Sequence, residues 1–166
     1  MVVLSLSGCV GNGEIKGTMS GVNAADLVSL EDASGFEFLG QRMLSAEDVS
    51  RQYVEVSGLV DGAEGFYQAD GVDFYIHAME FGSSSEAEDF VGQYKATFKP
   101  LSSGERFVEE SFNGHGATRI TTSTTFNGNP VARYHYIWSN EHFVIVVGGN
   151  SADPAYISSL AEATGY

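Results

Sequence analysis

Two dipeptides, Asp70-Gly71 and Asn127-Gly128, constrain the fold more than any other feature of this sequence. Each lies between two runs rich in β-branched and aromatic residues, and each supplies the positive φ angles that a two-residue hairpin turn requires. We therefore expect antiparallel strands at roughly 64–69 and 72–81 around the first turn. The runs ATRITTSTTF and VARYHYIW flank the second turn in the same way. Twenty glycines against three prolines fit many short strands joined by turns.

Two main helices are predicted beside these strands. Ser83 and Glu86 have the spacing of a capping box, and an apolar stripe follows at helical spacing, so we expect a helix over about 84–97. Asp153 as N-cap, with Pro154 in the first helical position, begins the last helix. The expected fold class is α+β, with an antiparallel sheet of about six strands packed with two main helices. A short helix over 45–53 is a weaker expectation.

The order of these elements resembles the α-β-α sandwich of the Mog1/PsbP-type domains. The resemblance rests on element order alone and carries no specific motif. It implies a central antiparallel sheet with helices packed on it. The run HFVIVVGG suits a central strand covered on both faces, because both sets of alternating side chains are apolar.

The only cysteine, Cys9, ends the segment Leu6-Ser7-Gly8-Cys9, which follows the apolar run 1–4 and precedes a glycine-rich stretch. This segment resembles the lipobox of prokaryotic lipoproteins, in which the cysteine accepts a lipid. The resemblance implies a membrane anchor on Cys9 and a position at the cell surface or extracytoplasmic face. A chance match is the alternative. Because no Lys or Arg precedes Lys16, we expect the signal peptide to begin upstream of Met1.

The lipobox divides the chain into three parts. Residues 1–9 are predicted to be the end of a signal peptide. Residues 10–23, rich in glycine and without apolar periodicity, are predicted to be a flexible tether. Residues 24–166 are predicted to form a single α+β domain.

The chain is strongly acidic, with 8 Lys+Arg against 22 Asp+Glu and a formal net charge of −14 at pH 7. Such a field repels phosphate backbones and anionic headgroups, so we expect neither nucleic acid nor direct membrane-surface binding. The predicted contact with the membrane is the lipid on Cys9 alone.

Four histidines are the remaining chemical candidates. His77 and His135 lie in the middle of predicted strands, and Arg133 shares a strand face with His135. If the faces coincide, these three residues form a small polar cluster. His115 lies in a predicted turn over 114–116, where a solvated ring is expected. The histidine spacing does not match a metal site, so we assign no catalytic or metal-ligating residue and expect no cofactor.

A row of aromatic side chains alternates along one predicted strand at Tyr134, Tyr136 and Trp138. Such a row forms either a stacking platform for a ligand or the core beneath a helix. The favoured interpretation is core, with Phe90, Tyr94 and Tyr156 of the two helices as the packing partners; a binding role for Trp138 remains open.

The leading functional hypothesis is a membrane-tethered lipoprotein domain with a non-catalytic binding or envelope-assembly role, whose partner is an envelope protein or a small ligand. A secreted or lipid-anchored enzyme with a dispersed site around His77, His135 and Arg133 is the first alternative. A structural subunit of a surface layer or filament is the second, because Thr-rich strands make good edges for lateral pairing. The oligomeric state stays open.

Overall fold

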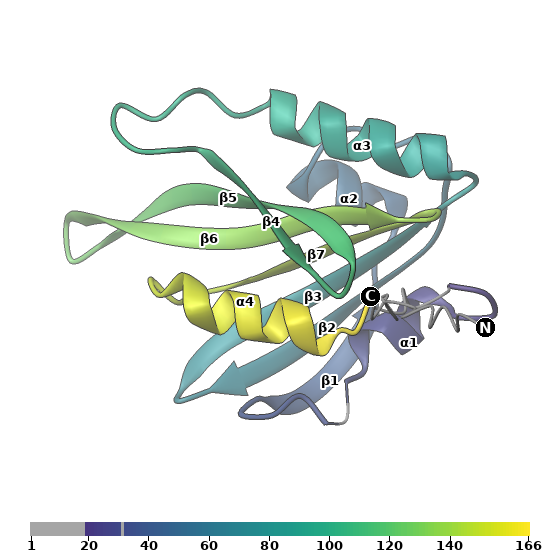
Figure 1. Ribbon diagram of the computed structural model, residues 1–166, viewed down its shortest axis with the longest axis horizontal. Helices are drawn as coiled ribbons and strands as arrows, with labels where there is room; N and C mark the ends of the chain where they lie inside the picture. The colour runs from purple at the N-terminus through teal and green to yellow at the C-terminus, as the bar shows by residue number, and fades with distance from the viewer. Residues whose placement is uncertain (1–18, 31) are drawn as a thin grey trace, which may run out of the picture.

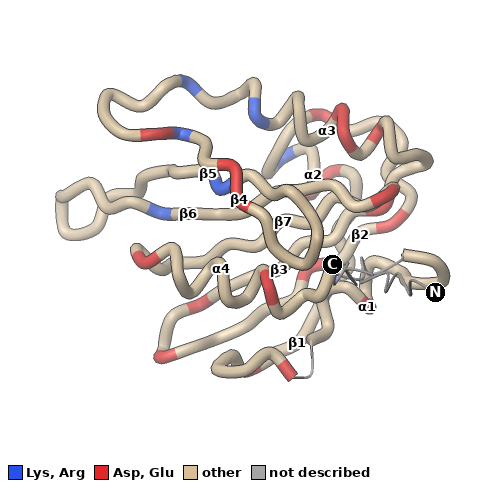
Figure 2. The backbone as a smooth tube through the Cα atoms, viewed as in Figure 1, with Lys and Arg blue, Asp and Glu red and all other residues tan. Residues whose placement is uncertain are grey.

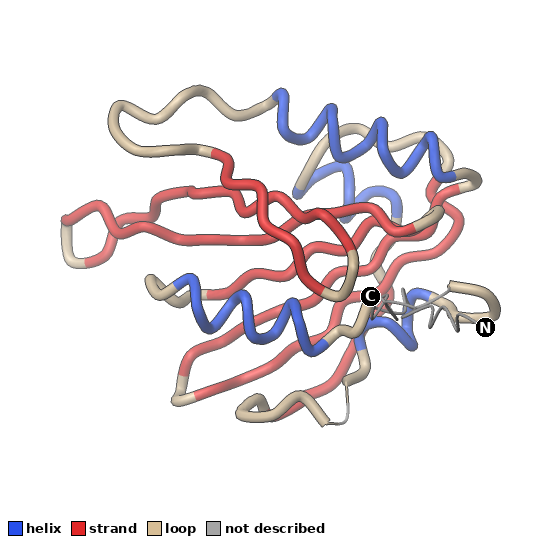
Figure 3. Tube along the Cα trace, in the orientation of Figure 1, coloured by secondary structure: helices blue, strands red, loops and turns tan. Residues whose placement is uncertain are grey.

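A seven-stranded antiparallel sheet forms the centre of the computed structural model, which describes residues 19–30 and 32–166 (Figures 1 and 3). The strand order is β1-β2-β3-β7-β6-β5-β4. The elements are α1 (Ala24–Val28), β1 (Glu37–Met43), α2 (Ala46–Gln52), β2 (Leu59–Ala69), β3 (Val72–Phe81), α3 (Ser84–Ala96), β4 (Phe107–Phe112), β5 (His115–Phe126), β6 (Asn129–Asn140), β7 (Phe143–Gly149) and α4 (Pro154–Ala163). The α+β class is confirmed. The expected number of about six strands is too low, because the described chain forms seven.

Both predicted hairpin turns are confirmed. Asp70 and Gly71 have φ angles of 51° and 76°, and Asn127 and Gly128 have φ angles of 50° and 79°. These are the left-handed conformations that a type I′ turn requires. β2 nevertheless begins at Leu59, earlier than the predicted start at 64.

A further turn of this kind corrects the prediction for 114–116. Asn113 and Gly114 have φ angles of 51° and 74°, so the chain reverses before His115 rather than around it. His115 is the first residue of β5 and is 6% exposed, not solvated. Its Nε2 lies 3.4 Å from Nδ2 of Asn140.

The predicted helix starts are confirmed by their caps. Ser83 accepts a hydrogen bond from the Glu86 amide at the start of α3, and Asp153 accepts one from the Ala155 amide at the start of α4. The short α2 begins with a capping box between Ser45 and Asp48. α1 was not expected, because one five-residue turn is too short to show helical periodicity.

The helices cover both faces of the sheet. Residues of α2 and α3, including Val49 and Phe90, pack with Met79 on one face. Residues of α1 and α4, including Leu27 and Ile157, pack on the other. Each face therefore has its own hydrophobic core. Separately, no described helix is long and apolar enough to cross a bilayer.

The folded part of the chain includes the end of the predicted tether. Met19 is 1% exposed and belongs to the core on the face of α1 and α4, and Val22 packs against that core. The predicted domain boundary at residue 24 is therefore placed too late. The remainder of the tether, the lipobox and Cys9 lie outside the described residues.

Candidate functional site

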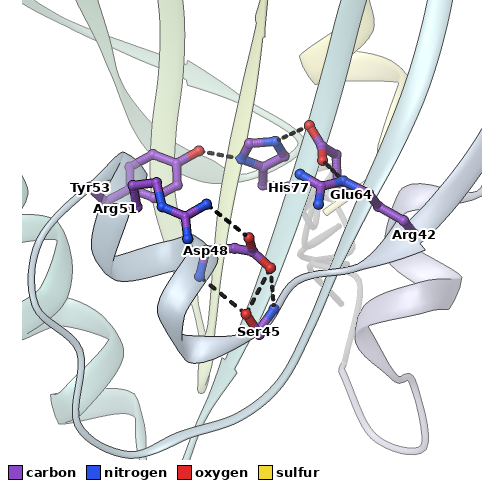
Figure 4. Close-up of polar contacts among 7 residues, drawn as sticks. All are labelled: Arg42, Ser45, Asp48, Arg51, Tyr53, Glu64 and His77. Carbon is purple, nitrogen blue, oxygen red and sulfur yellow. Dashed lines mark hydrogen bonds and ion pairs between the residues drawn. The ribbon is translucent and has the colours of Figure 1, made fainter.

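A chain of polar groups begins at the exposed Arg42, crosses three strands through the buried Glu64 and His77, and ends at α2 (Figure 4). Arg42 Nε on β1 lies 2.5 Å from Glu64 Oε2 on β2, and Glu64 Oε1 lies 2.9 Å from His77 Nε2 on β3. The hydroxyl of Tyr53, at the C-terminal end of α2, is hydrogen-bonded to His77 Nδ1. Antiparallel register places these side chains in a row, since Arg42 pairs with Glu64 and Glu64 pairs with His77.

The charge state of Glu64 sets the direction of these hydrogen bonds. Burial raises the pKa of Glu64, but the hydrogen bonds and charges of His77 and Arg42 together outweigh it and hold the pKa below its usual value. The ionised carboxylate can only accept, so Nε2–H of His77 donates to it, while Nδ1 on the other side of the ring is hydrogen-bonded to the hydroxyl of Tyr53. His77 thus links Glu64 on β2 to Tyr53 at the end of α2, with one ring nitrogen on each side.

His135 lies on the same face of the sheet as His77, a coincidence of faces that alternation within each strand left open. Its Nε2 is 3.2 Å from the hydroxyl of Tyr94 on α3, and the side chain is 7% exposed. Burial, and to a smaller extent the charge of nearby His77, lower the pKa of His135 to about 4. The rings of Tyr53 and Tyr94 lie 5.0 Å apart, which links the two histidine pairs.

Arg133 has a separate hydrogen bond. Its Nη1 donates to the carbonyl of Ala132 at 2.9 Å. The predicted cluster is therefore built differently, since Glu64 and two tyrosines, rather than Arg133, provide the polar partners of the histidines. Within the described residues, no three His, Cys, Asp or Glu side chains are grouped so as to hold a metal ion.

The row of aromatic residues on β6 points to the opposite face. Trp138 and Tyr136 are each 1% exposed and pack edge-to-face on Phe112. Phe90 and Tyr94 lie on the other side of the sheet, so the predicted packing of the aromatic row against these two residues is wrong. Strand alternation assigned the row to one face of the sheet but could not say which helix covers that face. Trp138 is core and offers no exposed platform.

Tyr134, the third member of this row, is only partly buried. The guanidinium of Arg119 stacks 5.3 Å from the centre of its ring. Together they line an open groove of about 280 Å³ with Val108, Thr121 and the loop residues Leu101, Ser103, Gly104 and Glu105. A second hollow of about 260 Å³ shares Arg119 and reaches Pro154 at the start of α4.

A hydrogen-bonded pair holds Arg119 in place. Arg119 Nε lies 2.8 Å from Glu110 Oε1, and the hydroxyl of Tyr136 donates to Glu110 Oε2 at 2.5 Å. Burial raises the pKa of Glu110, but these two hydrogen bonds and the charge of Arg119 outweigh it and lower the pKa. The guanidinium therefore keeps a fixed position with one face on Tyr134.

Charge is distributed unevenly over the fold (Figure 2). The segment 95–133 carries five Lys and Arg and three Glu, a net charge of +2. The rest of the described chain carries two Arg and 17 Asp and Glu, a net charge of −15. The basic end therefore consists of the end of α3, the β5–β6 hairpin and the groove between them and α4.

Comparisons of the chain with models of known protein families, with curated proteins and with solved structures gave no match.

Sequence reasoning missed Arg119 and Glu110. The available signal was the presence of acidic and basic residues on two strands joined by a turn, where diagonal neighbours on one face lie within reach of each other. Without the register, however, neither the pairing nor the position of Tyr134 beside Arg119 can be deduced.

Proposed function

We propose that this chain is a lipid-anchored extracytoplasmic binding module that recognises an acidic partner at its basic end without transforming it. The lipid is carried by Cys9, as the lipobox resemblance implies. The partner is an acidic segment of an envelope protein or a small carboxylate ligand. The observation that carries the proposal is the net charge of +2 around an open aromatic groove in a chain that is otherwise strongly acidic.

The groove has the chemistry for such a partner. Arg119 offers donors that remain after its bond to Glu110, because a guanidinium has five N–H groups. Tyr134 provides an apolar ring with a polar tip, and Thr121 and Ser103 add hydroxyls. The surrounding negative field steers an acidic partner away from every other surface of the domain.

The position of the basic end also fits a tethered module. The described chain begins just before α1, which lies at the opposite end of the longest axis from the β5–β6 turn (Figure 1). A domain attached near α1 presents its basic end away from the point of attachment.

The histidine cluster supports the non-catalytic proposal. His77 and His135 are 2% and 7% exposed, and the ring nitrogens described above are engaged with Tyr53, Glu64 and Tyr94. An enzyme built on these residues would need to break these contacts before a substrate could reach either ring. Robust turnover of common hydrolase substrates that is lost in His77→Ala or His135→Ala would contradict the proposal.

The groove is tested with an acidic peptide of alternating Glu and Leu, titrated into isotope-labelled protein at low salt. We expect NMR shifts concentrated at Thr121 and Tyr134, and binding weakened at least about tenfold by Arg119→Gln. Arg51→Gln, an exposed arginine paired with Glu47 on α2, is the matched control and leaves binding unchanged. Equal losses in both variants, or no binding of the peptide, would contradict the proposed site.

The anchor is tested separately in cells that express the complete gene product. Cys9→Ser releases the protein to the soluble or culture fraction while the domain stays folded. Retention at the membrane with no lipid adduct by mass spectrometry would contradict the anchor.

A further inference from the structure

The outer edge of β1 is open in the described part of the chain. β1 lies at the end of the sheet and pairs only with β2. Leu39 is 54% exposed and Met43 is 80% exposed along it, and Val60 at the start of β2 is 62% exposed. Edge strands of soluble proteins are normally protected, so an edge with exposed apolar side chains is a candidate for strand addition.

A groove of about 510 Å³ adjoins the Met43 end of this strand. It is formed by the start of α1, the end of β1 and the start of β2, and Asp61 and Ala63 lie on its wall. This end of the molecule is acidic, because Asp26 on α1 and Asp61 and Glu64 on β2 outnumber Arg42, which also lines the groove.

The β5–β6 hairpin offers a second open edge. β4 pairs with β5 only as far as Ile120, so the outer side of β5 from Thr122 to Phe126 extends past the last strand (Figure 1). Residues 123–130 are all exposed, and Phe126 beside the turn is 62% exposed. The segment 122–133 contains Arg133 and no acidic residue.

These two surfaces lie at opposite edges and opposite ends of the sheet. The groove lies beside the Met43 end of β1, whereas the hairpin extends past β4 on the other edge. Each has an open strand edge and an exposed apolar side chain, and their charges are opposite.

We propose that the β5–β6 hairpin of one copy of this chain adds to the β1 edge of a second copy, with Phe126 seated in the groove beside Met43. The inference goes beyond the proposed function, because neither surface includes Arg119 or Tyr134. The contact is heterologous, so it propagates head to tail and forms open chains of copies. Screening by salt weakens it, since the attraction is electrostatic in part.

The test is the molar mass of the full chain by analytical ultracentrifugation, at low salt with reductant, over a range of concentrations. We expect the molar mass of the wild-type protein to rise with concentration above the single-chain mass of 17.8 kDa. Phe126→Asp and Met43→Arg each remove one surface, and each variant alone stays at 17.8 kDa. An equimolar mixture of the two forms a dimer and nothing larger, because one intact hairpin and one intact groove remain.

Matched controls lie on exposed positions of α4. Ser159→Asp and Ala163→Arg make the same charge changes away from both surfaces, and both assemble as wild type does. Arg119→Gln also assembles as wild type, so loss of peptide binding and loss of assembly are separable. Unchanged thermal unfolding establishes that the variants fold.

Three outcomes would overturn the inference. If the molar mass of the wild-type protein stays at 17.8 kDa at every concentration, the copies do not bind each other. A mass that stops at a dimer in wild type indicates a closed, symmetric contact. A mixture of the two variants that remains monomeric shows that the hairpin and the groove do not bind each other.

Discussion

Tyr94 and His135 come from α3 and β6 and meet between helix and sheet, with the tyrosine hydroxyl 3.2 Å from His135 Nε2. Burial raises the pKa of Tyr94 to about 12, so the hydroxyl keeps its proton. Burial and the neighbouring His77 lower the pKa of His135 to about 4, so the ring is neutral at pH 7. The neutral Nε2 therefore accepts a hydrogen bond from Tyr94.

This lowered pKa predicts a loss of stability in mild acid. The unfolded chain takes up a proton on His135 near its ordinary pKa of 6.5, whereas the folded chain does so only near 4. The free energy of unfolding should therefore fall by about 3 kcal/mol as the pH decreases from 6.5 to 4. Urea unfolding at about pH 7 and at about pH 4.5 measures this slope.

His135→Gln should flatten the slope in that window, while His142→Gln, at a partly exposed position beside Glu80, should leave it unchanged. Below pH 4.5, the ordinary pKa of a glutamate, Glu64 lowers the free energy of unfolding further. Its folded-state pKa is lowered, so its contacts stabilise the fold only while the carboxylate is ionised. An equal slope in wild type and His135→Gln would show that His135 is not the responsible group.

Tyr53→Phe tests the link between α2 and the sheet. The substitution keeps the ring but removes the hydroxyl that is hydrogen-bonded to His77 Nδ1, so it should cost about 1–3 kcal/mol of unfolding free energy. The exposed ion pairs of Arg51 on the same helix should contribute nothing measurable, so Arg51→Ala is the control. Equal effects of the two substitutions would mean that the buried hydrogen bond does not hold α2 in place.

Trp138 contains a buried Nε1–H without a hydrogen-bond partner among the described residues. Trp138→Ala should destabilise the domain by about 3–5 kcal/mol, as expected for a large core side chain. Trp138→Phe should cost clearly less, because it retains part of the packing and removes a buried donor whose desolvation costs about 1–3 kcal/mol. Chemical unfolding of both variants measures the difference; equal losses would indicate that the indole N–H is satisfied in solution.

Gly65 marks the closest approach of α1 to the sheet. A Cβ at this position would lie 2.2 Å from the carbonyl oxygen of Val28, so Gly65→Ala must displace the end of α1. We expect a loss of about 1–3 kcal/mol, as for other overpacked sites. Gly116→Ala, where a Cβ meets nothing within 4 Å, is the control and should be nearly neutral. A neutral Gly65→Ala would show that α1 packs more loosely than described.

Much of the fold can be predicted from local sequence. Asp70-Gly71 and Asn127-Gly128 specify hairpins because few residues adopt positive φ, and Ser83 and Asp153 start helices because their side chains satisfy free amides. Each of these preferences acts within a few residues. The sequence therefore determined the strands, their turns, the main helices and which side chains of one strand share a face, as Arg133 and His135 do.

The tertiary structure alone decided what covers each face. It buries His115 and Trp138, brings Glu64 rather than Arg133 to the histidines, and leaves Tyr134 open beside Arg119. These relationships depend on the order and register of strands that are distant in sequence, and on helices whose side of the sheet no local pattern specifies. The physical reason is that strand pairing and helix docking are chosen by the total burial and hydrogen bonding of the assembled sheet, not by any one segment.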